Sequence, residues 1–213
     1  MLEKLPDAIG HALRGQRAGL EKTAFQSIDL RAGMAQIAVT SLAFADHAPI
    51  PARYTADGPG VSPPLQWSGV PKGAASLLLI VEDADSPTPH PLVHAIVVDL
   101  APVDGALAEG ALPSRDHDGS DVRTGRNSYL QSGWLPPDPP PGHGEHNYAF
   151  QLFALAGAPD PGVNPRRSAL IRVMAGHVLA AGLLTGTYSR GEPAEIGRAG
   201  ARVANPSLAR PAR

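Results

Sequence analysis

The amino-acid sequence predicts a mostly β domain, a β-sandwich of antiparallel sheets, with one helix near each end of the chain. Its 213 residues include 23 glycines and 23 prolines, which is typical of many turns rather than a helix bundle. Short apolar runs separated by these turns favour a sandwich. The hydrophobic content of 43% is enough to build one sizeable core.

The first twenty residues predict an amphipathic helix over 2–20. Their apolar positions follow the three-and-four spacing of one helical face, at Leu2, Leu5, Ile9 and Leu13. We interpret 1–33 as an N-terminal helical extension. Such a helix docks either on its own domain or on a second copy of the chain, and the second case gives a homodimer.

Four segments predict strands, because each is apolar or alternating and lies between turn residues. The longest continuous apolar run is "SLLLIVED", and "HAIVVDL" is rich in β-branched residues. The four segments are 34–44, 76–83, 94–100 and 148–156.

The C-terminal part predicts one long helix over 168–184, with Ser168 as the N-cap, followed by a short last strand "TGTYS". From 191 to 213 the chain is rich in Gly, Ala, Pro and Arg, with few apolar anchors, which predicts a flexible tail. The globular domain is therefore expected to span 34–190.

Composition excludes several classes of function. The formal charge of −2 provides no basic field for nucleic acid, and the absence of cysteine excludes disulfides and thiolate sites. No apolar run reaches the roughly 20 residues that span a bilayer, and the N-terminus lacks the apolar core of a secretory signal. We expect a cytoplasmic protein without a transmembrane segment, and the residues indicate no cofactor.

Acidic and imidazole side chains collect where the predicted strands end and begin. One strand ends at Asp83 and the next begins at His94, so antiparallel pairing brings both to one edge of the sheet. If the third strand runs parallel to the second, His146 and Tyr148 start at that same edge. A carboxylate beside two imidazoles suits a small anion or zwitterion, such as a phosphate joined to an amine.

Residues 81–100, "VEDADSPTPHPLVHAIVVDL", carry two aspartates, a proline-rich loop and a histidine that opens a buried strand. Further blocks follow in order: "GRNSY", "PPPGHGEHNYAFQLFAL" and "GHVLAAGLLTGTYS". Together, from about 36 to 190, they resemble the phosphatidylethanolamine-binding protein family, also called Raf kinase inhibitor-like proteins, here of the bacterial kind. The resemblance implies a β-sandwich with a helix near the C-terminus and an anion pocket at one end of the sheet.

The resemblance also implies roles for individual residues. It assigns the pocket to Asp83, His94, His146 and Tyr148, with Pro87 shaping the rim and Asp85 ordering the loop. Pro136 and Asp138 stand where the family often has glycines. Because proline has no N–H to donate and a carboxylate repels an anion, we expect an altered pocket.

The sequence therefore predicts a non-enzymatic binding protein that holds a small anionic or zwitterionic ligand and meets a protein partner at the pocket rim. Three alternatives stay open. They are a protease or kinase inhibitor that acts through its surface, a metal-assisted hydrolase, and a scaffold paired through its N-terminal helix. The hydrolase would draw zinc ligands from two histidine pairs and one carboxylate, His90, His94, His143, His146 and Asp83. Separate histidine pairs do not by themselves predict a metal site, so we predict none.

Overall fold

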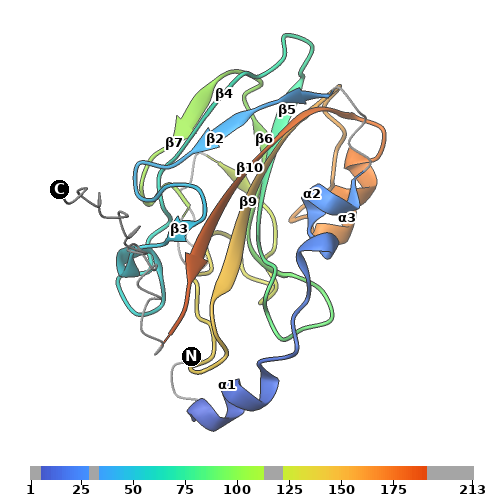
Figure 1. Cartoon of the computed structure of the whole chain (residues 1–213). Helices are drawn as coiled ribbons and strands as arrows, with labels where there is room; N and C mark the ends of the chain where they lie inside the picture. The colour runs from blue at the N-terminus through green and yellow to red at the C-terminus, as the bar shows by residue number, and fades with distance from the viewer. Residues whose placement is uncertain (1–5, 29–33, 113–121, 191–213) are drawn as a thin grey trace, which may run out of the picture.

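Two β-sheets form the centre of the structure (Figure 1). The structure is a computed structural model, and it describes residues 6–28, 34–112 and 122–190. The mostly β prediction is confirmed. Leu2, Leu5 and the predicted tail 191–213 lie outside the described residues. None of the helices in 6–28, 34–112 and 122–190 has the length and hydrophobicity of a membrane-spanning segment.

The larger sheet has seven strands in the order β1-β10-β9-β5-β6-β8, and β3 pairs with the far end of β10. The long strands β5, β6, β9 and β10 pair antiparallel, as predicted. Their apolar runs are buried on both faces, which explains why they show no alternation. The bounds are β1 Ala35–Gln36, β3 Ala48–Pro49, β5 Ser76–Asp83, β6 Leu92–Leu100, β8 Arg123–Thr124, β9 His146–Leu155 and β10 Val178–Tyr188.

The prediction of purely antiparallel sheets is wrong at the β10 edge. Both β1 and β3 pair with β10 in parallel, with Ala35 opposite Ala180 and Ala48 opposite Gly186. The chain from β1 to β3 therefore travels along β10 in the same direction as β10 itself. Two short contacts with one long strand must then both be parallel.

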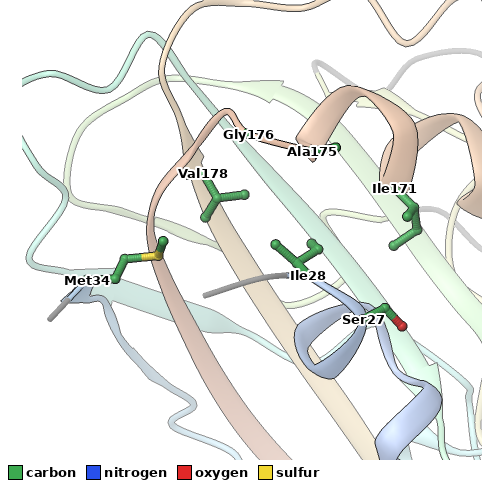
Figure 2. Close-up of a pocket in the computed structure, with 7 residues that line it drawn as sticks. All are labelled: Ser27, Ile28, Met34, Ile171, Ala175, Gly176 and Val178. Carbon is green, nitrogen blue, oxygen red and sulfur yellow. The ribbon is translucent and has the colours of Figure 1, made fainter. Parts of the chain in front are cut away.

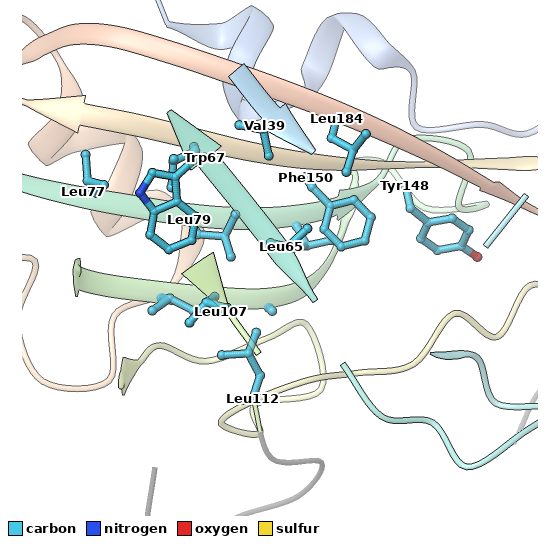
Figure 3. Close-up of a cluster of buried hydrophobic side chains, with 14 of the residues drawn as sticks. Val39, Leu65, Trp67, Leu77, Leu79, Leu107, Leu112, Tyr148, Phe150 and Leu184 are labelled. Atoms are coloured by element: carbon cyan, nitrogen blue, oxygen red, sulfur yellow. The ribbon is translucent and has the colours of Figure 1, made fainter. Parts of the chain in front are cut away.

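The smaller sheet contains β2 Ala38–Thr40, β4 Leu65–Ser68 and β7 Gly105–Leu107, in the order β2-β4-β7. Its inward side chains, such as Val39, Leu65 and Trp67, share one apolar core with Leu79 and Phe150 of the larger sheet (Figure 3). The single strand predicted over 34–44 is thus two short strands, and each belongs to a different sheet.

Helices cover the other face of the larger sheet. There a second core joins α2 Ala24–Ser27 and α3 Arg167–Met174 to Leu78, Ile80 and Phe153 (Figure 1). The remaining helical pieces are α1 Asp7–Leu13, η2 Leu20–Lys22 and η3 Ala52–Tyr54.

The predicted helix 168–184 is wrong over its second half. Helix α3 begins at Arg167, with Arg166 rather than Ser168 as the N-cap, and ends at Met174. Gly176 then adopts φ 75, a left-handed conformation that glycine favours and that ends helices. From Val178 onward the chain pairs with β9, so "TGTYS" is the end of β10 rather than a separate strand.

The N-terminal segment, by which we mean residues 6–28, lies against the chain's own domain. Helix α1 is shorter than predicted, and Ile9 of the predicted apolar face is 42% exposed. The buried residue of α1 is Gly10, which packs against the backbone of Pro141. Further along, the N–H groups of Ala18 and Gly19 donate to the loop that follows β5. A homodimer through this helix stays a prediction.

Candidate functional site

Three strand ends meet at one edge of the larger sheet. Strand β5 ends at Asp83, which is opposite Leu92 of β6 and Tyr148 of β9 in the register. Because β6 and β9 are both antiparallel to β5, they run in the same direction, which is the condition that the sequence left open. His94 near the start of β6 and His146 at the start of β9 therefore lie at the edge where Asp83 ends its strand.

A narrow pocket of about 40 Å³ opens at this edge. Four of the six residues predicted for the site line it, namely Asp83, Pro87, His94 and His146. The other lining residues come from the loop after β5, the start of β6 and the segment before β9: Ser86, Leu92, Tyr129, Leu135, Pro136, Asp138, Pro139 and Pro140. Four prolines on one rim stiffen it and offer no N–H groups to a ligand.

A chain of hydrogen bonds runs from the pocket to the N-terminal segment. Nδ1 of His146 lies 2.8 Å from Oδ2 of Asp83, and its Nε2 lies 2.7 Å from Nδ1 of His143. Nε2 of His143 in turn lies 2.9 Å from the carbonyl oxygen of Leu13 and 3.2 Å from that of Gln16. His146 and His143 are fully buried.

His94 presents an unpartnered acceptor in the pocket. Its Nδ1 donates to the carbonyl oxygen of Leu135 at 2.6 Å, while its Nε2 is buried and has no hydrogen-bond partner among the described residues. Burial lowers the pKa of His94 and outweighs the opposing effect of Asp83. A neutral imidazole that donates through Nδ1 carries a lone pair at Nε2, so it can accept a hydrogen bond from a ligand.

Tyr148 does not line the pocket, but its ring packs against the imidazoles of His94 and His146. Its ring meets His94 edge-on at 5.1 Å and stacks with His146 at 6.4 Å. It lies at one end of the core between the sheets (Figure 3). Burial, and after it the charge of Asp83, raises the pKa of Tyr148, so the hydroxyl keeps its proton.

Asp85 faces the N-terminal segment and not the pocket. Its Oδ1 pairs with Arg17 at 2.6 Å, and its Oδ2 accepts from the backbone N–H and the side-chain amide of Asn147. Burial alone would raise the pKa of Asp85, but the hydrogen bonds from Arg17 and Asn147 outweigh it and lower the pKa. Arg17 also donates to the carbonyl of Glu145, next to His146.

The negative charge of Asp138 is compensated by Arg190, a residue that no sequence pattern connects to the pocket. Nη1 of Arg190 lies 2.6 Å from Asp138 and also donates to the carbonyl of Pro139, while its Nη2 pairs with Asp57 at 2.8 Å. Burial lowers the pKa of Arg190, but hydrogen bonds to Asp57 and Asp138 raise it by more. Asp138 therefore repels an anion less than its charge alone would suggest.

The histidine spacing that suggested zinc has another explanation. His143 and His146 turn their ring nitrogens toward each other at 2.7 Å, so they do not converge on one ion. His90 is exposed on the loop after β5. Within the described ranges, no group of three or more His, Asp or Glu side chains could hold a metal.

A second pocket, of about 280 Å³, lies between α2, the end of α3 and the start of β10 (Figure 2). None of its lining residues ionises between pH 4 and 9: Ser27, Ile28, Met34, Ile171, Ala175, Gly176 and Val178. Two of its lining residues, Ile28 and Met34, flank in sequence the residues 29–33, which the structure does not describe. The small pocket at the strand ends is therefore the better candidate site, because the acid–base side chains lie there.

Comparisons with known proteins agree with this architecture. The profile of the phosphatidylethanolamine-binding protein family matches residues 40–189. The UPF0098 protein of Chlamydia trachomatis is 38% identical over 156 residues, which cover 71% of this chain and 98% of that protein. The UPF0098 protein of Methanothermobacter thermautotrophicus is 39% identical over 154 residues, covering 70% of this chain and 96% of that protein.

Solved structures are similar as well. The crystal structure of a phosphatidylethanolamine-binding protein homolog from Chlamydia trachomatis matches with a TM-score of 0.65 and 36% identity, covering 73% of this chain and 98% of that one. YbcL of Escherichia coli, described as a member of the mammalian PEBP family, matches with a TM-score of 0.66 and 26% identity. It is covered over 99% of its length by 73% of this chain. By the family profile, the close relatives and the fold, this chain belongs to the phosphatidylethanolamine-binding protein family.

Proposed function

We propose that this chain is a non-enzymatic binding protein that holds the zwitterionic or anionic end of a small molecule in the pocket at the strand ends. The observation that carries the proposal is the buried, unpartnered Nε2 of His94 in a pocket that also contains the Asp83–His146 pair. A buried acceptor without a partner costs free energy, which a ligand with a suitable donor recovers.

The pocket favours a zwitterion over a simple anion. A neutral His94 needs a hydrogen-bond donor from the ligand, and an ammonium group supplies one. The lining carboxylates Asp83 and Asp138 are each paired with a basic side chain, so an adjoining phosphate meets little repulsion. With prolines along the rim, a bare phosphate or acetate finds few backbone donors.

Family membership supports the same ligand class. The family takes its name from phosphatidylethanolamine, whose head group joins a phosphate to an amine. A pocket of about 40 Å³ suits the tip of such a head group rather than a whole lipid. The pocket opens beside the exposed end of the loop after β5, which is where a protein partner would meet the bound group. A cytoplasmic location stays part of this proposal.

Isothermal titration calorimetry with phosphoethanolamine, phosphate and acetate tests the proposal. Phosphoethanolamine should bind about tenfold more tightly than the two anions, because it gains a charge-assisted hydrogen bond to His94. The variant His146→Ala should lose at least that factor. His90→Ala is the control, since His90 is exposed outside the pocket, and thermal melting checks that each variant folds. No binding of phosphoethanolamine by the wild type, or full binding by folded His146→Ala, would overturn the proposal.

A further inference from the structure

The hydrogen-bond chain between the pocket and the N-terminal segment contains three contacts, and each contact needs one proton. The last acceptors are the carbonyl oxygens of Leu13 and Gln16, which have only lone pairs. Nε2 of His143 must therefore carry a proton and donate it. The N-terminal segment thus determines which nitrogen of His143 is protonated.

The tautomer of His143 determines the state of its neighbour. Burial, and after it the charge of His146, lowers the pKa of His143, so this imidazole is neutral and has a lone pair at Nδ1. That lone pair can only accept, so Nε2 of His146 is the donor across 2.7 Å. The other nitrogen of His146, Nδ1, faces the carboxylate of Asp83.

The contact with Asp83 completes the proton count. Oδ1 of Asp83 accepts the backbone N–H of Asp85 at 2.8 Å, which leaves Oδ2 for His146. An imidazole is a stronger base than a carboxylate, so the proton between these two groups belongs to His146. His146 then carries a proton on both nitrogens, and its charge cancels that of Asp83.

We propose that the N-terminal segment positions this proton: the carbonyls of Leu13 and Gln16 select the tautomer of His143, and His143 thereby holds His146 as an imidazolium paired with Asp83. His143 is a positioning residue, since it does not line the pocket. The family profile matches residues 40–189, so the N-terminal segment that contacts His143 lies outside the matched range.

The other charges near the two histidines agree with this state. Arg17 of the N-terminal segment, whose guanidinium donates to the carbonyl of His143 at 3.4 Å, favours a neutral His143. Titratable and charged groups near the pair include Asp83 of β5, Asp85 of the following loop, His94 of β6, Asp138 of the rim, Tyr148 of β9, and His11 and Arg17 of the N-terminal segment. Arg17 and Asp138 have their own ion-pair partners, Asp85 and Arg190.

Two glycine variants test whether the packing of α1 against the domain matters, because only one of them disturbs that packing. A methyl group at Gly10 would stand 1.8 Å from the carbonyl oxygen of Pro141 and 2.9 Å from the backbone nitrogen of His143. Both obstacles are backbone atoms, so Gly10→Ala must displace α1 from the segment 141–143. A methyl group at Gly15 has no neighbour within 4 Å. Gly15→Ala therefore controls for the loss of glycine near the end of the same helix.

Long-range proton–nitrogen NMR correlations of the imidazole rings in the full chain test the proposal without any ligand. At pH 7.5 the wild type and Gly15→Ala should show both nitrogens of His146 protonated and His143 as the neutral Nε2–H form. In Gly10→Ala, His143 should populate both tautomers, and a neutral His146 that is protonated on Nδ1 alone should appear, because the Nδ1–H tautomer of His143 donates to Nε2 of His146. A singly protonated His146 in the wild type, or an unchanged His146 in Gly10→Ala, would overturn the proposal.

Two variants at His143 keep the test decisive if Gly10→Ala does not fold. Glutamine has an acceptor oxygen and a donor nitrogen, so His143→Gln can replace both hydrogen bonds of the imidazole and should keep His146 doubly protonated. Leucine replaces neither, so His143→Leu should make His146 neutral at pH 7.5. Equal NMR signatures of His146 in these two variants would contradict the proposal.

The consequence for ligands rests on the proposed function and has its own readout. Taurine is a sulfonate zwitterion whose charges do not change between pH 6 and 8, so its affinity reports the protein's protonation alone. Affinity should stay constant over this range in the wild type and fall about tenfold toward pH 8 in His143→Leu, as the pocket loses one positive charge. If taurine does not bind while the NMR signatures appear, the proposed function fails and the proton assignment stands. If taurine binds with the same pH profile in both proteins, the positioning role fails instead.

Discussion

Neighbouring acidic residues at the end of β5 serve two different parts of the molecule. Successive side chains of a strand point to opposite faces, so Glu82 and Asp83 diverge. Glu82 is fully buried, accepts the N–H of Ala24 at 2.6 Å and pairs with Arg167, while Asp83 faces His146 in the pocket. At the end of one strand, Glu82 thus binds the N-terminal segment and Asp83 binds the pocket histidine.

The buried, neutral His94 should make the fold sensitive to mild acid. Its pKa is lowered in the folded state, whereas in the unfolded chain it is the ordinary value of about 6.5. The unfolded state therefore binds more protons as the pH falls below 6.5, and the free energy of unfolding decreases. In His94→Asn the amide can still donate to Leu135 but cannot titrate. Chemical denaturation at pH 8 and pH 5 should show that the wild type loses more free energy of unfolding than the variant, by up to about 2 kcal/mol if His94 stays neutral down to pH 5.

The difference between the two proteins isolates His94, because both contain the same other titrating groups. If both lose the same free energy of unfolding between pH 8 and pH 5, then His94 is not a buried neutral group. The pocket would then offer a protonated imidazole to its ligand, and the preference for a donor-bearing ligand would lose its basis.

At the scale of elements, strand β10 shows where sequence patterns mislead. The residues from Val178 to Leu184 are almost all apolar, with alanine and leucine, which are strong helix formers. The helix preference of these residues therefore predicts that α3 continues through them. Instead they form a strand, because they pair with β9, which lies more than twenty residues earlier in the chain. By contrast, β5 and β6 were predictable, because short continuous runs of Leu, Ile and Val between turn residues are typical of buried strands.

Gly182 in β10 should be intolerant of a side chain. A methyl group there would stand 2.2 Å from the carbonyl oxygen of Ile37 and 2.7 Å from Val39, where the chain crosses between the two sheets. Because the obstacle is backbone, Gly182→Ala should cost on the order of 2 kcal/mol of unfolding free energy, measured by urea denaturation. Gly73→Ala is the control, since its nearest neighbour is the Leu179 side chain at 3.8 Å. Equal stability of the two variants would show that the segment 36–40 does not press on β10 as described.

Across the whole molecule, the sequence predicted those pocket residues that lie at or near the ends of strands. Asp83 ends β5, His94 lies near the start of β6 and His146 begins β9, so their meeting follows from strand pairing once the direction of β9 is given. His143 and Arg17 could not be assigned this way. Each contacts backbone carbonyls more than one hundred residues away in sequence, and no periodicity records such a contact.

The N-terminal segment is fastened to the domain at two places on either side of the strand end. Near Asp85, Arg17 forms its ion pair and Ala18 and Gly19 donate to the carbonyls of Ser86 and Ala84. Near Glu82, the N–H groups of Ala24 and Phe25 donate to Glu82 and Gln151 at 2.6 Å each. Both sets of contacts are made by the same N-terminal segment. Weakening the contacts near Asp85 should therefore change hydrogen exchange near Glu82 only if the segment opens as one unit.

Native-state hydrogen exchange can separate these anchors. Asp85→Asn removes the charge that holds Arg17 but keeps a side chain that can still accept, so it weakens a charge-assisted bond without leaving a cavity. Exchange at Ala18 and Gly19 should accelerate about tenfold, while Leu79 in the core exchanges as in the wild type. If Ala24 and Phe25 accelerate with them, the segment opens as one unit and couples the Glu82 anchor to the pocket. Unchanged exchange at Ala18 and Gly19 would mean that their backbone hydrogen bonds hold the segment without Asp85, and then the charge at position 85 has no part in docking it.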